Sequence, residues 1–155
     1  TEAFRVDGSR QNVDLSDEQL QAMHGGLVTH NHPVHEEMRA DGKPYNGNSF
    51  SPEDVMTSRG ADLQELRAVT PKWTYSMQRP ENGWPSHSSL KQAIHEADKR
   101  VFLGLSMQVQ NGLRTAADGN DNFYHELWRE VSRQVPGLNY TRTPFHGGKA
   151  ARLPW

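Results

Sequence analysis

Cysteine is absent from the 155-residue chain, which excludes disulfide bonds and thiolate metal sites. A metal ion would therefore have to be bound by histidine and carboxylate side chains. The chain also lacks a signal peptide and any run of about 18 apolar residues that could span a bilayer. We expect a soluble protein without a membrane partner, either cytoplasmic or delivered as an effector domain. The sequence leaves the compartment open.

The chain has no large excess of either basic or acidic side chains. The chain has 17 Lys and Arg against 19 Asp and Glu, a formal net charge of −2, and no block of like charge. Because affinity for nucleic acid comes largely from clustered basic side chains, a nucleic-acid partner is not expected. With 34% hydrophobic residues, the length suits one compact domain, or a small core with a helical appendage. Because the chain begins at Thr1, we expect it to be part of a larger polypeptide.

Local signals predict an alternation of strands and helices in the first half of the chain. They indicate a strand in TEAFRVDG, a helix that begins at the capping residue Ser16, a buried strand in LVTHNH, a surface loop over 33–50, a helix from Ser51 to Gly60, and a hairpin over 63–77. The second half is expected to be helical over 88–110 and 121–137, with one short strand after residue 137 and a mobile or partner-docked tail.

The stretch LVTHNHPVHEE places three histidines at the end of the predicted buried strand. Residues two apart on a strand share a face, so His30 and His32 would present their imidazoles side by side. The pair could bind a metal ion, or it could be a surface pair that is hydrogen-bonded to backbone or water. A catalytic zinc site needs three protein ligands, and Asp54 in the first turn of the next helix could supply the third. Ser51 and Asp54 also fit a helix-capping arrangement, and both roles can coexist because a cap fixes the helix start that aims the carboxylate.

These residues resemble the signature of a known family. T-H-N-H-P followed by F-S-P-E-D-V is similar to the H-x-H-P…S-x-x-D pattern of the JAMM (JAB, MPN+) metalloproteases, and H-N-H-P looks especially like their RadC-like branch. The opening TEAFRVDG resembles the E-x-F strand of that branch. The resemblance covers roughly residues 1–78 and implies an α/β fold, a JAMM (cytidine-deaminase-like) mixed sheet flanked by helices. We therefore divide the chain into a metal-binding core, 1–80, and a helical C-terminal extension, 81–155, which packs on the core and ends in a flexible tail at 146–155.

The resemblance also implies a chemistry. It predicts Zn²⁺ bound by His30, His32 and Asp54, with a water in the fourth position. Glu2 stands where the family keeps its general base, and the Ser51 hydroxyl would donate to the oxyanion of the tetrahedral intermediate. The implied protein is a hydrolase, a metallopeptidase or isopeptidase that cleaves a peptide or isopeptide bond in a protein or peptide substrate.

The stretch between the histidine pair and Asp54 is longer than the usual gap in the family. We interpret it as an insertion that covers the site, selects substrates, or adds ligands through His35, Glu36 or Glu37. Other patterns are interpreted as structural. H-E-L-W-R at 125–129 lacks the second histidine of a zincin helix. The letters H-N-H at 30–32 match a nuclease motif by coincidence. Packing is the expected role of three tryptophans, Trp73, Trp84 and Trp128.

Two alternatives of other classes stay open. A catalytically silent JAMM-like module that binds a protein partner would have no metal. A metal-dependent nuclease or toxin effector domain of phage or bacterial origin is the second, since RadC-like domains also resemble those fused to phage head-morphogenesis proteins and polymorphic toxins. A groove for an extended peptide beside the metal would favour the peptidase, and a basic trough would favour the nuclease.

Overall fold

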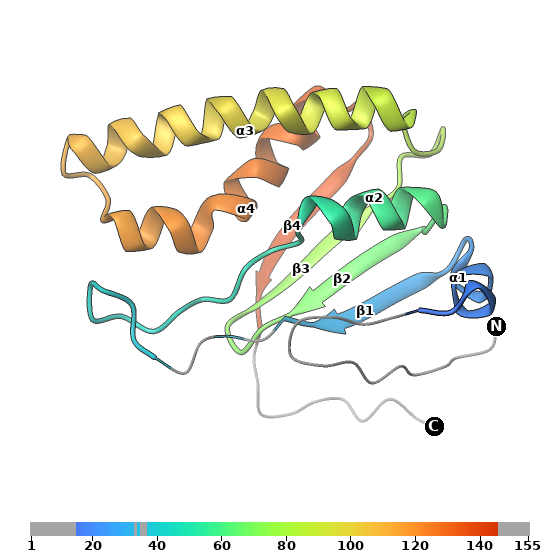
Figure 1. Ribbon diagram of the computed structural model, residues 1–155, viewed down its shortest axis with the longest axis horizontal. Coiled ribbons are helices and arrows are strands. Elements are labelled where there is room, and N and C mark those ends of the chain that lie inside the picture. Colours follow the sequence, from blue (N-terminus) through green and yellow to red (C-terminus); the bar gives the residue numbers. More distant parts are fainter. Residues whose placement is uncertain (1–14, 33, 35–36, 146–155) are drawn as a thin grey trace.

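The computed structural model describes residues 15–32, 34 and 37–145 (Figure 1). Its elements, in chain order, are α1 (Asp17–Met23), β1 (Leu27–Asn31), α2 (Pro52–Gly60), β2 (Glu65–Val69), β3 (Trp73–Gln78), α3 (His87–Gln110), α4 (Ala116–Gln134) and β4 (Asn139–Pro144). The predicted N-terminal strand with Glu2, and the predicted flexible tail at 146–155, lie outside the described residues. Within the described part, no helix is long and apolar enough to cross a bilayer.

The four strands form one mixed sheet in the order β1-β2-β3-β4. β1 and β2 are parallel, and the chain crosses between them through α2, as a parallel pair requires. The other two pairings are antiparallel. Between β2 and β3 the Thr70 N–H donates to the Trp73 carbonyl at 2.8 Å and closes the predicted hairpin. A mixed sheet flanked by helices, and with it the α/β class, is thus confirmed.

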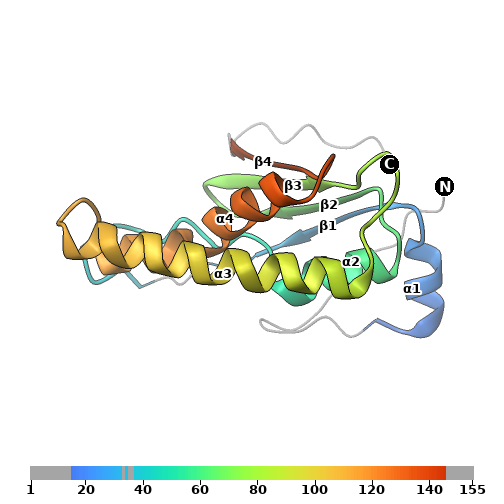
Figure 2. The same ribbon diagram turned by 90° about the horizontal axis from the view of Figure 1, so that it is seen from above.

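Three helices, α2, α3 and α4, lie along the same side of the sheet (Figure 2). Alternation along the strands explains this arrangement, because Leu66 and Ala68 of β2 and Tyr75 and Met77 of β3 are all buried on that side. The opposite face of β2 carries polar residues such as Glu65, whose carboxylate accepts hydrogen bonds from neighbouring side chains. The sheet therefore has one apolar face, and the helices cover it.

One hydrophobic core joins the two halves of the chain. It combines strand residues with fully buried side chains of α4, among them Leu127, Trp128 and Val131. The expected packing role of Trp128 is confirmed, and Trp73 and Trp84 pack against the same core. Helix α4 begins earlier than the predicted residue 121, since Thr115 caps it by accepting the Asp118 N–H at 3.0 Å. The first turns of α4 are polar and contain Gly119, which weakens a helix, so the sequence pattern did not indicate that the helix begins here.

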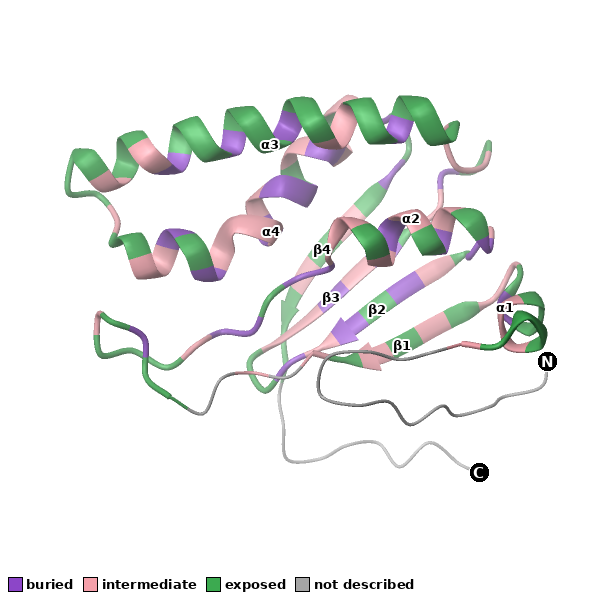
Figure 3. Cartoon of the chain, in the orientation of Figure 1, coloured by how far each residue is buried: buried purple, intermediate pink, exposed green. Residues whose placement is uncertain are grey.

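The predicted loop over 33–50 is a loop in its described part, but it does not stay on the surface throughout. Figure 3 shows buried positions along it, and they include Arg39, Asn46 and Phe50. A buried loop needs partners for its backbone groups, and here tertiary contacts provide them. The last residues of the loop lie beside the C-terminal end of β1, where Asn48 contacts His32, and lead into the N-terminus of α2.

Candidate metal centre

His30 and His32 lie on the helix-covered side of the sheet. Val28 and His30 are in register with the buried Leu66 and Ala68 of β2. The His32 N–H donates to the Val69 carbonyl at 2.9 Å, which continues the pairing one step beyond the last residue of β1. Both imidazoles therefore project from the same side of the strand, as their spacing predicts.

Asp54 is placed by the cap of α2. The Ser51 Oγ accepts the Asp54 N–H at 3.2 Å, and the Asp54 Oδ2 accepts the Ser51 N–H at 2.7 Å. Pro52 occupies the first helical position. This reciprocal capping box confirms the predicted arrangement and fixes the direction of the carboxylate. The same Oδ2 atom lies 3.7 Å from the His32 Nε2, so capping and a ligand role are compatible.

The three side chains converge. One potential ligand atom from each of His30, His32 and Asp54 lies within 4.8 Å of the other two. The two Nε2 atoms are 2.6 Å apart. Two imidazoles and one carboxylate form a common ligand set for divalent transition metals, so this group could hold a metal ion. Glu37 does not belong to the cluster found among the described residues, and Glu2, His35 and Glu36 lie outside them.

Protonation in the cluster suits metal binding. Burial lowers the pKa of His30 and the neighbouring His32 lowers it further, while Asp54 opposes them only in part. For Asp54, burial alone raises the pKa, but His32 and the hydrogen bond from the Ser51 N–H together outweigh it, and the pKa lies below its ordinary value. At neutral pH the cluster thus offers an imidazole lone pair and a charged carboxylate, the forms that bind metals.

A backbone carbonyl sets the tautomer of His32. The Nδ1 of His32 lies 2.7 Å from the Asn48 carbonyl oxygen. Because a carbonyl only accepts, Nδ1 carries the proton and donates it, which leaves the Nε2 lone pair directed at the other members of the cluster. Sequence reasoning missed Asn48, and no residue type could have revealed it, because the group involved is main chain.

Phe50 forms an apolar floor beneath the two imidazoles. Its ring centroid lies 6.2 Å from that of His30 and 6.4 Å from that of His32, and its side chain is fully buried. The ring also contacts Tyr75 and Tyr140. It keeps water away from one side of the cluster, which strengthens electrostatic interactions there.

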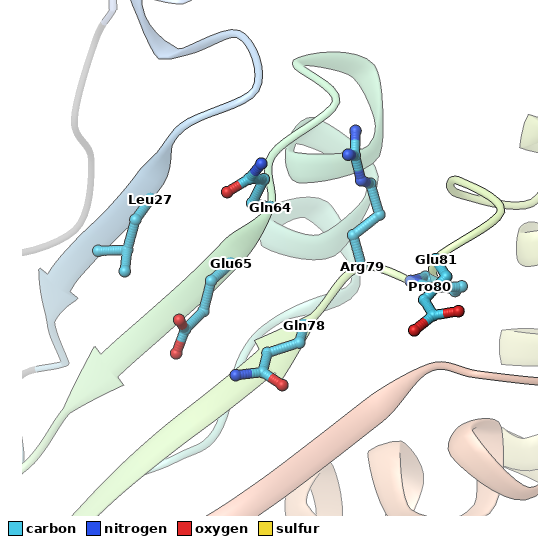
Figure 4. A pocket seen from close by; sticks show the side chains of 7 residues that line it. All are labelled: Leu27, Gln64, Glu65, Gln78, Arg79, Pro80 and Glu81. Carbon is cyan, nitrogen blue, oxygen red and sulfur yellow. The ribbon is translucent and has the colours of Figure 1, made fainter. Parts of the chain in front are cut away.

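A hollow of about 360 Å³ lies elsewhere, near the start of β1 and the end of β3 (Figure 4). Leu27, Glu65 and Gln78 are in register with one another and belong to the face opposite to His30. Two of its charged groups have partners already, since Arg79 pairs with Asp62 at 2.6 Å and Glu65 with Arg67 at 2.6 Å. The hollow is therefore separate from the cluster of His30, His32 and Asp54.

Comparison with protein-family models, with curated proteins and with solved structures gave no match. The resemblance to the JAMM family therefore rests on the sequence motif alone.

Proposed function

We propose that the chain is a JAMM-type zinc metallopeptidase, RadC-like in its motif, that hydrolyses a peptide or isopeptide bond. One observation carries the proposal. His30, His32 and Asp54 converge within 4.8 Å, from a strand and a helix that a long loop separates, with Ser51 at the start of the helix. The four residues occupy the positions of the family signature. A scaffold without metal has no need for this convergence.

Zinc is the metal that the proposal assigns to the cluster. When bound, it supplies Lewis acidity and brings the pKa of a water close to neutrality. His30, His32 and Asp54 would hold it. In the metal-free chain His30 Nε2 donates to His32 Nε2, because Nδ1 is the protonated nitrogen of His32. Binding of a metal through the His30 Nε2 would therefore require this proton to move to Nδ1, a change of tautomer that leaves the ring neutral.

Two further residues would act on the substrate. Glu2 is proposed as the general base that takes a proton from the attacking water and returns it to the leaving amine. Ser51 uses an oxygen lone pair to cap α2 and keeps its O–H for donation. That O–H is proposed to stabilise the negative charge that develops on the carbonyl oxygen of the substrate.

Metal binding is the first test. After incubation with zinc and dialysis, elemental analysis should find one zinc per chain in the wild type and none in His30→Ala or Asp54→Asn. His95→Ala and Glu53→Gln are matched controls at exposed positions and should retain zinc. Circular dichroism would establish that all variants fold. A folded wild-type chain that stays metal-free would contradict the peptidase proposal and favour the protein-binding module.

Hydrolysis is the second test, on peptide and isopeptide substrates with the zinc-loaded chain. Ser51→Ala and Glu2→Ala should keep their zinc, and Ser51→Ala should lower kcat about 10²- to 10³-fold. Ser16→Ala removes the equivalent cap of α1, so it should cost a similar stability of about 1 kcal/mol and leave kcat unchanged. A zinc-loaded chain that cleaves nucleic acid but no peptide would support the nuclease alternative instead.

A further inference from the structure

The segment 46–50, here named the strap, runs through the interior next to the metal-binding cluster. Asn46, Gly47, Ser49 and Phe50 are buried, and only Asn48 is exposed. Loops normally run over the surface, because buried backbone groups need hydrogen-bond partners. The partners of the strap therefore show what holds it in place.

One set of partners comes from the sheet. The Thr70 Oγ1 donates to the Asn46 carbonyl at 2.9 Å, and the Tyr75 hydroxyl donates to the Gly47 carbonyl at 2.8 Å. Gly47 has a φ of +83°, and a Cβ added there would lie 2.5 Å from the Thr70 Cγ2. Glycine is thus required where the strap meets the sheet.

A second set of partners comes from the C-terminal elements α4 and β4. The Asp121 carboxylate accepts the Asn46 N–H at 2.9 Å, and the Tyr140 hydroxyl lies 2.9 Å from the Ser49 Oγ. The Trp128 Nε1–H donates to the Phe50 carbonyl at 2.7 Å, in a fully buried hydrogen bond. Elements from outside the JAMM-like part of the sequence therefore fix three of the five strap residues.

The strap in turn contacts both histidines of the cluster and leads directly into the residue that caps Asp54. The Asn48 carbonyl accepts the His32 Nδ1–H, and the Phe50 ring packs against both imidazoles. The residue that follows Phe50 is Ser51, whose N–H binds the Asp54 carboxylate. A displacement of Phe50 would consequently move the group that orients His32 and the cap that orients Asp54.

We propose that Trp128 is a positioning residue of the metal centre. This inference rests on the proposed metal site and extends it to α4. The indole N–H is the single hydrogen-bond donor of that side chain, and its loss would leave the Phe50 carbonyl buried without its partner. The strap would then shift, and the Asn48 carbonyl and the Ser51 cap would no longer hold the ligands in one arrangement. The loss of a group that orients a metal ligand typically weakens metal affinity 10- to 100-fold.

The test compares two tryptophans. Trp128→Phe removes the donor to the strap, while Trp84→Phe removes an equivalent Nε1–H that donates to the Leu63 carbonyl at 2.9 Å, away from the strap. Zinc affinity, measured by competition with a chelator, should fall about 10-fold in Trp128→Phe and stay within about 2-fold of wild type in Trp84→Phe. The visible absorption spectrum of the cobalt-substituted chain should change in Trp128→Phe alone, because it reports the arrangement of the ligands.

Tyr140→Phe provides a second variant in case Trp128→Phe does not fold. It keeps the ring and removes only the hydroxyl, which contacts Ser49 and also the His125 Nδ1, and a smaller loss of zinc affinity is expected. Unchanged affinity and spectrum in both folded variants, with normal binding by the wild type, would overturn the inference and leave the proposed function intact. An equal loss in Trp84→Phe would also overturn it, because the effect would then follow general stability. A wild-type chain that binds no metal would overturn both.

Discussion

Individual residues in this protein are held in defined protonation states by their surroundings. A main-chain carbonyl fixes which ring nitrogen of His32 donates, and burial lowers the pKa of His30 and favours its neutral form. His125 on α4 is a third case, since its Nδ1 lies 2.9 Å from the Tyr140 hydroxyl. Burial, followed by repulsion from Arg142, Arg129 and Arg114, lowers the pKa of His125 to about 3. A neutral imidazole is therefore part of the native interior.

Acid should destabilise the fold through His125. Its folded-state pKa of about 3 lies below the ordinary value of 6.5, so the unfolded chain binds the proton more readily. The neutral His125 side chain stabilises the fold fully above pH 6.5, and this contribution to the free energy of unfolding is lost as the pH falls from 6.5 towards 3. We expect a loss on the order of 2 kcal/mol between pH 7 and pH 4, after allowance for solvent near the group.

Denaturant titrations of the wild type and His125→Gln would measure this contribution. Glutamine keeps a hydrogen-bonding side chain but has no proton to gain in this range, so the stability gap between the two chains should narrow as the pH falls. The carboxylates are common to both and cancel in the comparison. Parallel pH profiles for the two chains would show that His125 does not contribute.

Among the elements, the loop before α2 is joined to α4 by a buried cation. The Arg39 side chain is 2% exposed; its Nη1 lies 2.9 Å from the Asp121 carboxylate, and its Nε lies 3.0 Å from the Asp41 carboxylate. Asp121 also accepts the Asn46 N–H, so the same carboxylate serves both the cation and the strap. The hydrogen bond to Asp41, above all, raises the pKa of Arg39, which therefore stays charged.

Arg39→Ala should lower the free energy of unfolding by about 3 kcal/mol, because it leaves the buried Asp121 carboxylate without its cation. Arg100→Ala is the matched control. The Arg100 side chain is 64% exposed and lies 3.1 Å from the Glu130 carboxylate. Its removal should lower the free energy of unfolding by less than about 0.5 kcal/mol. Chemical denaturation of the three chains would give these values. Equal losses in both variants would mean that burial adds nothing to the Arg39 pair.

The whole molecule depends on elements that lie far apart in the sequence. β4 pairs with β3 along its full length, from Asn139 opposite Gln78 to Pro144 opposite Trp73. α4 supplies Leu127, Trp128 and Val131 to the core that also contains Phe50 and the strand residues. The C-terminal extension therefore completes the sheet and the core as well as packing against them.

A chain truncated after residue 84 should consequently fail to fold. It would expose Leu66, Tyr75 and Met77, which the C-terminal elements help to bury. Amide dispersion in NMR spectra and far-ultraviolet circular dichroism would detect the loss. A folded, zinc-binding 1–84 fragment would instead establish residues 1–80 as an independent core.

Much of the local structure follows from the sequence alone. Ser16 and Ser51 mark helix starts because each is followed three residues later by a side chain that completes a capping box. Alternation predicts the hairpin, and the spacing of His30 and His32 predicts a shared face. These signals act over a few residues, so they are readable without the rest of the chain. The assignments that rest on family resemblance, including zinc and the role of Glu2, stay predictions.

Only the tertiary structure decided what surrounds the histidine pair. It brings Asp54 to His32 across a long loop, buries that loop through Arg39, and aims the Asn48 carbonyl at an imidazole. The sequence carries no local signal for these contacts, because they join residues far apart in the chain, and the contact from Asn48 uses a main-chain atom that every residue possesses. Packing of α4 and β4 against the sheet determines where such atoms lie, so the shared face of the histidine pair was predictable while the structure around it was not.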